Sequence, residues 1–116
     1  MTLEELYEMI GGDYRSTKSR FMTDERILRF VRKFPLDQSY RLLESSLSTG
    51  DQAEAFRAAH TLKGVAQNLG FTALYEIASS VTEVLRGGGT ATADQLDELK
   101  IKYDLVIDSI PLVADL

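Results

Sequence analysis

The segment DQAEAFRAAHTLKGVAQNLG, residues 51–70, decides the fold expected of this chain. Its apolar residues recur at the three- and four-residue spacing of one helical face. They are Ala55, Ala59, Leu62, Ala66 and Leu69. Asp51 is a typical N-cap residue, Glu54 stands where a capping box needs it, and Gly70 is a typical C-terminal stop. The segment therefore predicts one long amphipathic helix that buries this face.

Three further long segments show the same periodicity. Their predicted ranges are 36–49, 72–86 and 92–110, with Thr72 as the expected cap of the second. Short connections between amphipathic helices favour antiparallel neighbours, so residues 36–110 are predicted to form an up-down-up-down four-helix bundle. No alternating run of β-branched residues competes with this pattern, and the predicted fold class is all-α.

Shorter segments precede the bundle. Apolar residues recur at helical spacing in 3–10 and in 24–34, and the stretch from Asp13 to about Met22 is expected to connect them. Residues 1–34 are thus predicted to supply two short N-terminal capping helices that cover one end of the bundle. Residues 111–116 form a tail, and a length of 116 residues fits a single domain over 1–116.

Composition excludes several classes of function. Thirteen basic and 18 acidic residues give a net charge of −5, which opposes binding to a phosphate backbone, so we expect no nucleic-acid partner. The chain has no cysteine for disulfide or thiolate chemistry. No run approaches the roughly 20 apolar residues of a membrane span, and the first ten residues do not resemble a secretory signal. We therefore expect a cytoplasmic protein without membrane attachment, too short to contain a kinase with its own nucleotide-binding domain.

His60 is the only histidine, and Gly64 follows it one turn later. A glycine inside a helix costs roughly 1 kcal/mol relative to alanine, which indicates that something approaches this face closely. At 100° per residue, His60, Lys63, Gly64 and Gln67 share a surface opposite the apolar stripe. His60 is therefore predicted to point to solvent.

Phe56 and Arg57 lie one turn before His60 and add an apolar contact and a second cation to this predicted docking face. A neutral imidazole is a nucleophile that can accept a phosphoryl group, and Lys63 is placed to counter the added negative charge. No set of residues at readable spacing forms a metal site, so Mg²⁺ would come from a partner. An exposed histidine is also commonly a solvated polar residue, and spacing alone leaves both interpretations open.

The run Ala58-Ala59-His60-Thr61-Leu62-Lys63-Gly64, followed by Asn68-Leu69-Gly70, resembles the signature of histidine-containing phosphotransfer (HPt) domains. The opening LEELYEMIGGDY and the closing helix also fall where such domains have them. Val65 and Ala66 depart from the pattern, because many members carry small hydroxyl residues there. The resemblance implies a helical bundle that takes a phosphoryl group from the aspartate of one receiver domain and passes it to another. It assigns His60 as phosphoacceptor, Lys63 as its supporting cation and Gly64 as a clearance position.

The implied partners are response-regulator receiver domains, with a hybrid sensor histidine kinase as a further candidate. We expect a monomeric carrier with no intrinsic cofactor and with Mg²⁺ on the receiver. The alternative is a helical adaptor that binds receivers or other signalling proteins through Phe56, Arg57, Gly64 and Gln67 and is never phosphorylated. A hydrolase with His60 as general base would need a nucleophile or orienting acid, and neither stands at readable spacing.

Overall fold

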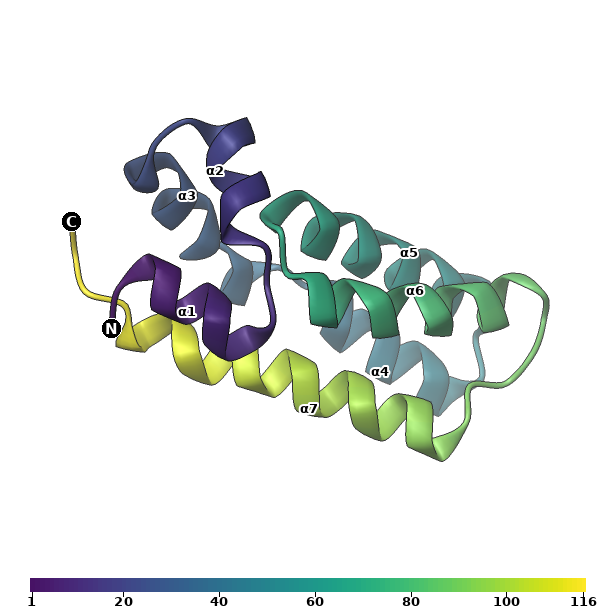
Figure 1. The fold of residues 1–116 in the computed structure, drawn as a ribbon. Helices are drawn as coiled ribbons and strands as arrows, with labels where there is room; N and C mark the ends of the chain where they lie inside the picture. Colours follow the sequence, from purple (N-terminus) through teal and green to yellow (C-terminus); the bar gives the residue numbers. More distant parts are fainter.

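A computed structural model of residues 1–116 contains α-helices, two 3-10 turns and no strand (Figure 1). The α-helices are α1 (Leu3–Ile10), α2 (Tyr14–Phe21), α3 (Asp24–Val31), α4 (Ser39–Thr49), α5 (Gln52–Leu69), α6 (Thr72–Arg86) and α7 (Ala93–Ser109). The 3-10 turns are η1 (Phe34–Leu36) and η2 (Ile110–Leu112). The predicted all-α fold class is confirmed.

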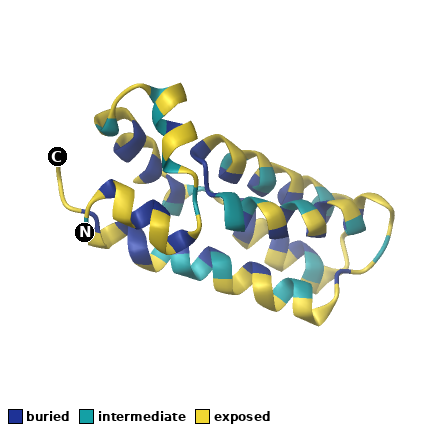
Figure 2. Ribbon diagram, viewed as in Figure 1, coloured by how far each residue is buried: buried dark blue, intermediate teal, exposed yellow.

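The four long helices, α4 to α7, form the body of the molecule. α5 packs against both α4 and α6, while α7 packs against α6 and α1. The outer helices α4 and α7 meet through Tyr40 and Tyr103, whose stacked ring centroids are 4.0 Å apart. The buried residues of each long helix face the shared interior, and the outer surfaces are exposed (Figure 2).

Capping residues set the ends of the long helices. The Asp51 side chain accepts a hydrogen bond of 3.1 Å from the backbone N–H of Glu54 and so starts α5. Gly70 ends α5 with φ of +73°, a left-handed conformation that favours glycine. Thr92 and Gln95 form a complete capping box at the start of α7. At α6, however, the N-cap position is Phe71, and Thr72 is already helical, so the predicted cap is wrong by one residue.

Three short helices precede the body, whereas the sequence predicted two. The stretch expected to be a connector is the helix α2, which has only one buried residue, Thr17. Asp13 caps it by accepting from the N–H of Ser16 at 3.0 Å, and the Thr17 hydroxyl donates to the Asp13 carbonyl at 2.8 Å. These contacts stabilise the first turn of α2, which lacks an apolar stripe.

The first long helix begins later than predicted. Pro35 lies inside the 3-10 turn η1, and α4 starts only at Ser39, whose backbone N–H donates to the Asp37 carboxylate at 2.9 Å. Leu36 was expected in the apolar stripe of this helix, but the residue is 74% exposed. The helix before it also ends early, at Val31, because the chain turns before Pro35.

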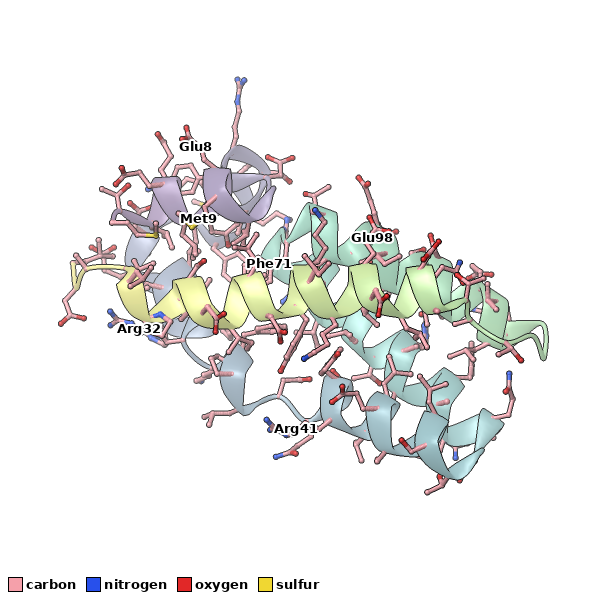
Figure 3. The ribbon with its side chains drawn as sticks, turned by 90° about the horizontal axis from the view of Figure 1, so that it is seen from below. Glu8, Met9, Arg32, Arg41, Phe71 and Glu98 are labelled. Carbon is pink, nitrogen blue, oxygen red and sulfur yellow. The ribbon has the colours of Figure 1, made fainter.

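The N-terminal helices are anchored at two places. Ser109 on α7 donates to the sulfur of Met9 at 3.3 Å, and Arg32 pairs with Asp115 at 2.6 Å, close to the C-terminal end of α7 (Figure 3). At the other anchor, the Tyr7 hydroxyl donates to the Leu69 carbonyl at 2.7 Å. The last turn of α5 is thereby fixed by α1. No helix has the length and apolar character required to cross a membrane.

Candidate functional site

His60 lies on the exposed face of α5, as the helical spacing predicts. Its neighbours Ala59 and Leu62 are completely buried on the opposite side of the helix. Because the buried residues of α5 face the core, the imidazole on the other side of the helix points to solvent. The ring is available to a partner without any change in the fold.

The phenyl ring of Phe56 supports the imidazole from one turn earlier. The two rings are nearly parallel, with an angle of 4° and centroids 5.9 Å apart. The guanidinium carbon of Arg86, on α6, lies 4.9 Å from the centroid of the Phe56 ring, within the range of a cation–π contact. Phe56 is half-buried and so connects the His60 face of α5 to α6.

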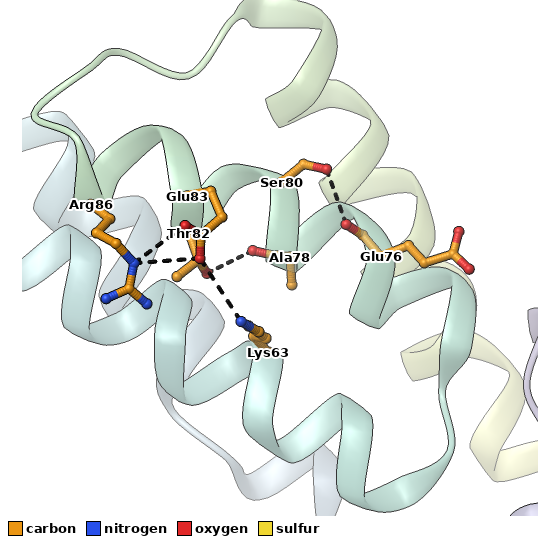
Figure 4. Close-up of polar contacts among 7 residues, drawn as sticks. All are labelled: Lys63, Glu76, Ala78, Ser80, Thr82, Glu83 and Arg86. Carbon is orange, nitrogen blue, oxygen red and sulfur yellow. Dashed lines mark hydrogen bonds and ion pairs between the residues drawn. The ribbon is translucent and has the colours of Figure 1, made fainter.

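Lys63 faces α6 as well. Its ammonium nitrogen is 4.0 Å from Oε1 of Glu83, and Nε of Arg86 is 3.3 Å from Oε2 of the same carboxylate (Figure 4). The Lys63 side chain is only 21% exposed. The Glu83 carboxylate therefore contacts two cations where α6 borders the exposed surface of α5 that carries His60. Glu83 and Arg86 are not among the residues predicted from the sequence, because only the packing of α6 on α5 brings them to this place.

Gly64 lies in open space. A Cβ atom built on it would meet no heavy atom within 4 Å outside its local helical backbone. The fold itself therefore does not require glycine here. This openness is consistent with a position that keeps the surface beside His60 clear for a partner.

Arg57 lies on the other border of the exposed face, where a depression also involves Asp37 and Leu42 near α4. Its guanidinium forms an ion pair with Glu54, and this hydrogen bond raises the pKa of Arg57. Much of its charge is therefore offset locally. Gln67 is exposed one turn after Lys63 and lines a shallow depression with Gly64. The structure thus places Lys63 and Arg57 on opposite sides of His60.

Residues of the N-terminal segment border the surface around Gly64. Phe30 and Lys33 line one depression with Gly64, and Arg20 lines another. These three residues are not among those predicted from the sequence, since nothing in their spacing indicates that α2 and α3 lie beside α5. No group of three or more His, Cys, Asp or Glu side chains comes together to form a candidate metal site.

The chain matches one known protein family. The family model of the Hpt domain matches residues 36–109, which is more than half of the chain. The matched range includes His60 and all of α4 to α7. No curated protein and no solved structure matches the chain. Hpt domains are phosphotransfer carriers of two-component systems rather than kinases, and they interact with receiver domains and kinases. The chain belongs to the Hpt domain family.

Proposed function

We propose that the protein is a phosphorelay intermediate that accepts a phosphoryl group on His60 from a receiver-domain aspartate and passes it to a second receiver. The observation that carries this proposal is the exposed imidazole next to the open Gly64 position. Phosphoryl transfer needs the attacking and leaving atoms in line and in close approach. A face without side-chain bulk one turn from His60 allows that approach.

The proposed reaction conserves the phosphoryl group. The lone pair of one imidazole nitrogen attacks the phosphorus of the aspartyl phosphate, and the bond from phosphorus to the carboxylate oxygen breaks. The aspartate leaves as a free carboxylate, and a phosphoramidate forms on His60. Attack by the aspartate of the second receiver then reverses these steps. We expect Mg²⁺ on the receiver, where it supports the departing or attacking carboxylate.

The surrounding residues have distinct proposed roles. Lys63 offsets the charge of the transferred group, while Phe56 holds the imidazole ring by its parallel contact. Arg57, Gly64 and Gln67 contact the docked receiver. In this proposal α4 to α7 act as an up-down-up-down bundle, supported by the packing of each on the next. We further propose that the protein works as a cytoplasmic monomer.

The decisive experiment follows a radioactive phosphoryl group. Receiver domains of the host are phosphorylated with labelled acetyl phosphate and mixed with the wild-type protein or the His60→Gln variant. We expect acid-labile label on the wild type, none on the variant, and movement of the label to a second receiver when one is added. Equal far-ultraviolet circular dichroism of both proteins is the folding control. Label retained on His60→Gln would refute the assignment, and receiver binding without label under donor excess would favour the adaptor.

A further inference from the structure

The charges of this chain are distributed unevenly. Residues 14–33, which comprise α2, α3 and their immediate flanks and are here named the basic lobe, carry a net charge of +5, although the whole chain carries −5. The rest of the protein therefore carries −10. The basic residues of the lobe are Arg15, Lys18, Arg20, Arg26, Arg29, Arg32 and Lys33. Figure 1 shows α2 and α3 at one end of the long helices, and half of the residues of α2 are exposed (Figure 2).

Several of these cations are occupied by the fold. Lys18 pairs with Asp24 at 2.7 Å, and Arg32 pairs with Asp115 near the end of α7. Arg20 and Lys33 differ, because neither forms an ion pair with a carboxylate. Their charges are therefore available to a partner.

Arg20 and Lys33 belong to one continuous row of side chains. The guanidinium carbon of Arg20 lies 5.7 Å from the centroid of Phe21, and the ammonium nitrogen of Lys33 lies 5.4 Å from that of Phe30. The two phenyl centroids are 5.3 Å apart. Arg20 also donates to the backbone carbonyl of Asn68 at 2.8 Å, which fixes this end of the row to the last turn of α5. We name Arg20, Phe21, Phe30 and Lys33 the cation–aromatic row.

The row adjoins the surface beside His60. Phe30 and Lys33 line one depression together with Gly64, and Arg20 lines a second depression that also includes Gly64 and Gln67. Phe30 is 42% exposed, so part of its ring remains open to solvent although it packs against Phe21. A protein docked over Gly64 would therefore cover both ends of the row.

Building on the proposed function, we propose that the cation–aromatic row extends the docking face and recognises a carboxylate-rich rim beside the phosphorylated aspartate of a receiver. An aspartyl phosphate is anionic, and the remaining −10 of this protein repels an anionic partner. The unpaired cations Arg20 and Lys33, at the edge of the docking face, attract an anionic partner to this surface. This attraction raises the association rate and favours partners with a complementary charge. The exposed part of the Phe30 ring adds an apolar contact in the docked complex.

The test compares two charge-matched double variants. Arg20→Glu/Lys33→Glu changes the row, whereas Arg15→Glu/Arg29→Glu makes the same change of charge within the basic lobe, at exposed positions of α2 and α3 outside both depressions. Label transfer to His60 is measured against receiver concentration at low salt and at about 0.15 M salt, where the Debye length is about 8 Å. The receiver is the host domain that phosphorylates the wild type fastest.

For the row variant we expect kcat/KM to fall at least tenfold, the saturating rate to stay within twofold, and the salt dependence to flatten. The control variant should stay within about threefold of the wild type at 0.15 M salt. If both variants are slowed equally, the effect comes from net charge alone and the proposal is wrong. Wild-type kinetics of the row variant would also overturn it. Loss of binding to phosphatidylglycerol vesicles with unchanged transfer would assign the row to a lipid surface instead. Failure of the proposed function is recognised separately, because the wild type itself would then acquire no label.

Discussion

The ammonium nitrogen of Lys63 lies 4.0 Å from a carboxylate oxygen of Glu83, so the cation one turn from His60 is already engaged by α6. The other oxygen of Glu83 is 3.3 Å from Nε of Arg86, whose guanidinium lies over the Phe56 ring. One carboxylate therefore contacts two cations, one on α5 and one on α6. In the proposed relay, a phosphoryl group on His60 would therefore compete with Glu83 for the charge of Lys63.

Glu83→Gln should favour the phosphorylated form of His60. Removal of the carboxylate leaves Lys63 free to pair with the phosphoryl group and eliminates a repulsive charge. A partly exposed pair of this kind is worth about 0.5–1 kcal/mol, which corresponds to a two- to fivefold change in the transfer equilibrium. The measurement is the equilibrium fraction of labelled protein against a fixed receiver.

Lys63→Ala should shift the same equilibrium in the opposite direction, because it removes the supporting cation. Glu98→Gln, on the exposed side of α7 and outside the ion pairs, is the matched control and should leave the equilibrium unchanged. If Glu83→Gln and Lys63→Ala both behave as the wild type, Lys63 has no role in stabilising the phosphoryl group.

Substitution of Gly64 should separate stability from function. Because a Cβ atom there meets no other group, Gly64→Ala should raise the free energy of unfolding by about 1 kcal/mol. Gly64→Gln should also be at least as stable as the wild type, yet slow phosphoryl transfer by tenfold or more, since its long side chain occupies the space of the receiver. Urea unfolding and transfer kinetics measure the two effects. A destabilised Gly64→Ala, or a Gln variant with wild-type transfer, would contradict the clearance role.

The helix that carries His60 was predictable because its burial follows its sequence period. All five residues of the α5 stripe are buried, from Ala55 to Leu69, and both ends carry residues with clear capping preferences. The α2 segment YRSTKSRF has no such stripe. Asp13 caps it, and the fully buried Thr17 packs against the end of α5, with its hydroxyl oxygen 3.4 Å from the Leu69 carbonyl oxygen, a contact 52 residues away in sequence. Local spacing contains no information about such a contact.

The same distinction applies to the candidate site. The exposure of His60 and the grouping of Lys63, Gly64 and Gln67 depend only on the geometry of one helix. The pairing of Lys63 with Glu83 depends on the register in which α6 packs against α5, and the cation–aromatic row depends on where α2 and α3 dock. Both are tertiary relationships, so only the three-dimensional structure could reveal them.

Gly70→Ala should be strongly destabilising. The residue has φ of +73°, and its Cβ atom would lie 1.8 Å from Oγ1 of Thr17, so both strain and collision oppose the change. We expect a loss of about 3 kcal/mol in the free energy of unfolding. Gly50→Ala is the matched control, with the same φ and no group within 4 Å of its Cβ, and should cost about 1 kcal/mol. Equal costs for both variants would show that the contact with Thr17 is not tightly held.

The Asp24 carboxylate should make the stability of the basic lobe depend on pH. Hydrogen bonds from Lys18, at 2.7 Å, and from Tyr14 hold the pKa of Asp24 below its ordinary value of 3.8. The folded state thus binds this proton more weakly than the unfolded chain. The resulting stability is fully present above the ordinary pKa and is lost as the pH falls through the lowered one.

Asp24→Asn should therefore be less stable than the wild type at pH 7, by about 1 kcal/mol for a partly exposed pair with an added hydrogen bond. The difference should shrink progressively as the pH is lowered from about 5 to about 2, because the wild-type carboxylate becomes protonated. Urea unfolding across this pH range provides the measurement. Asp97→Asn, at an exposed position of α7 outside the ion pairs, should remain within about 0.5 kcal/mol of the wild type throughout. A difference for Asp24→Asn that persists undiminished at about pH 2 would show that the carboxylate stabilises the lobe by something other than its charge.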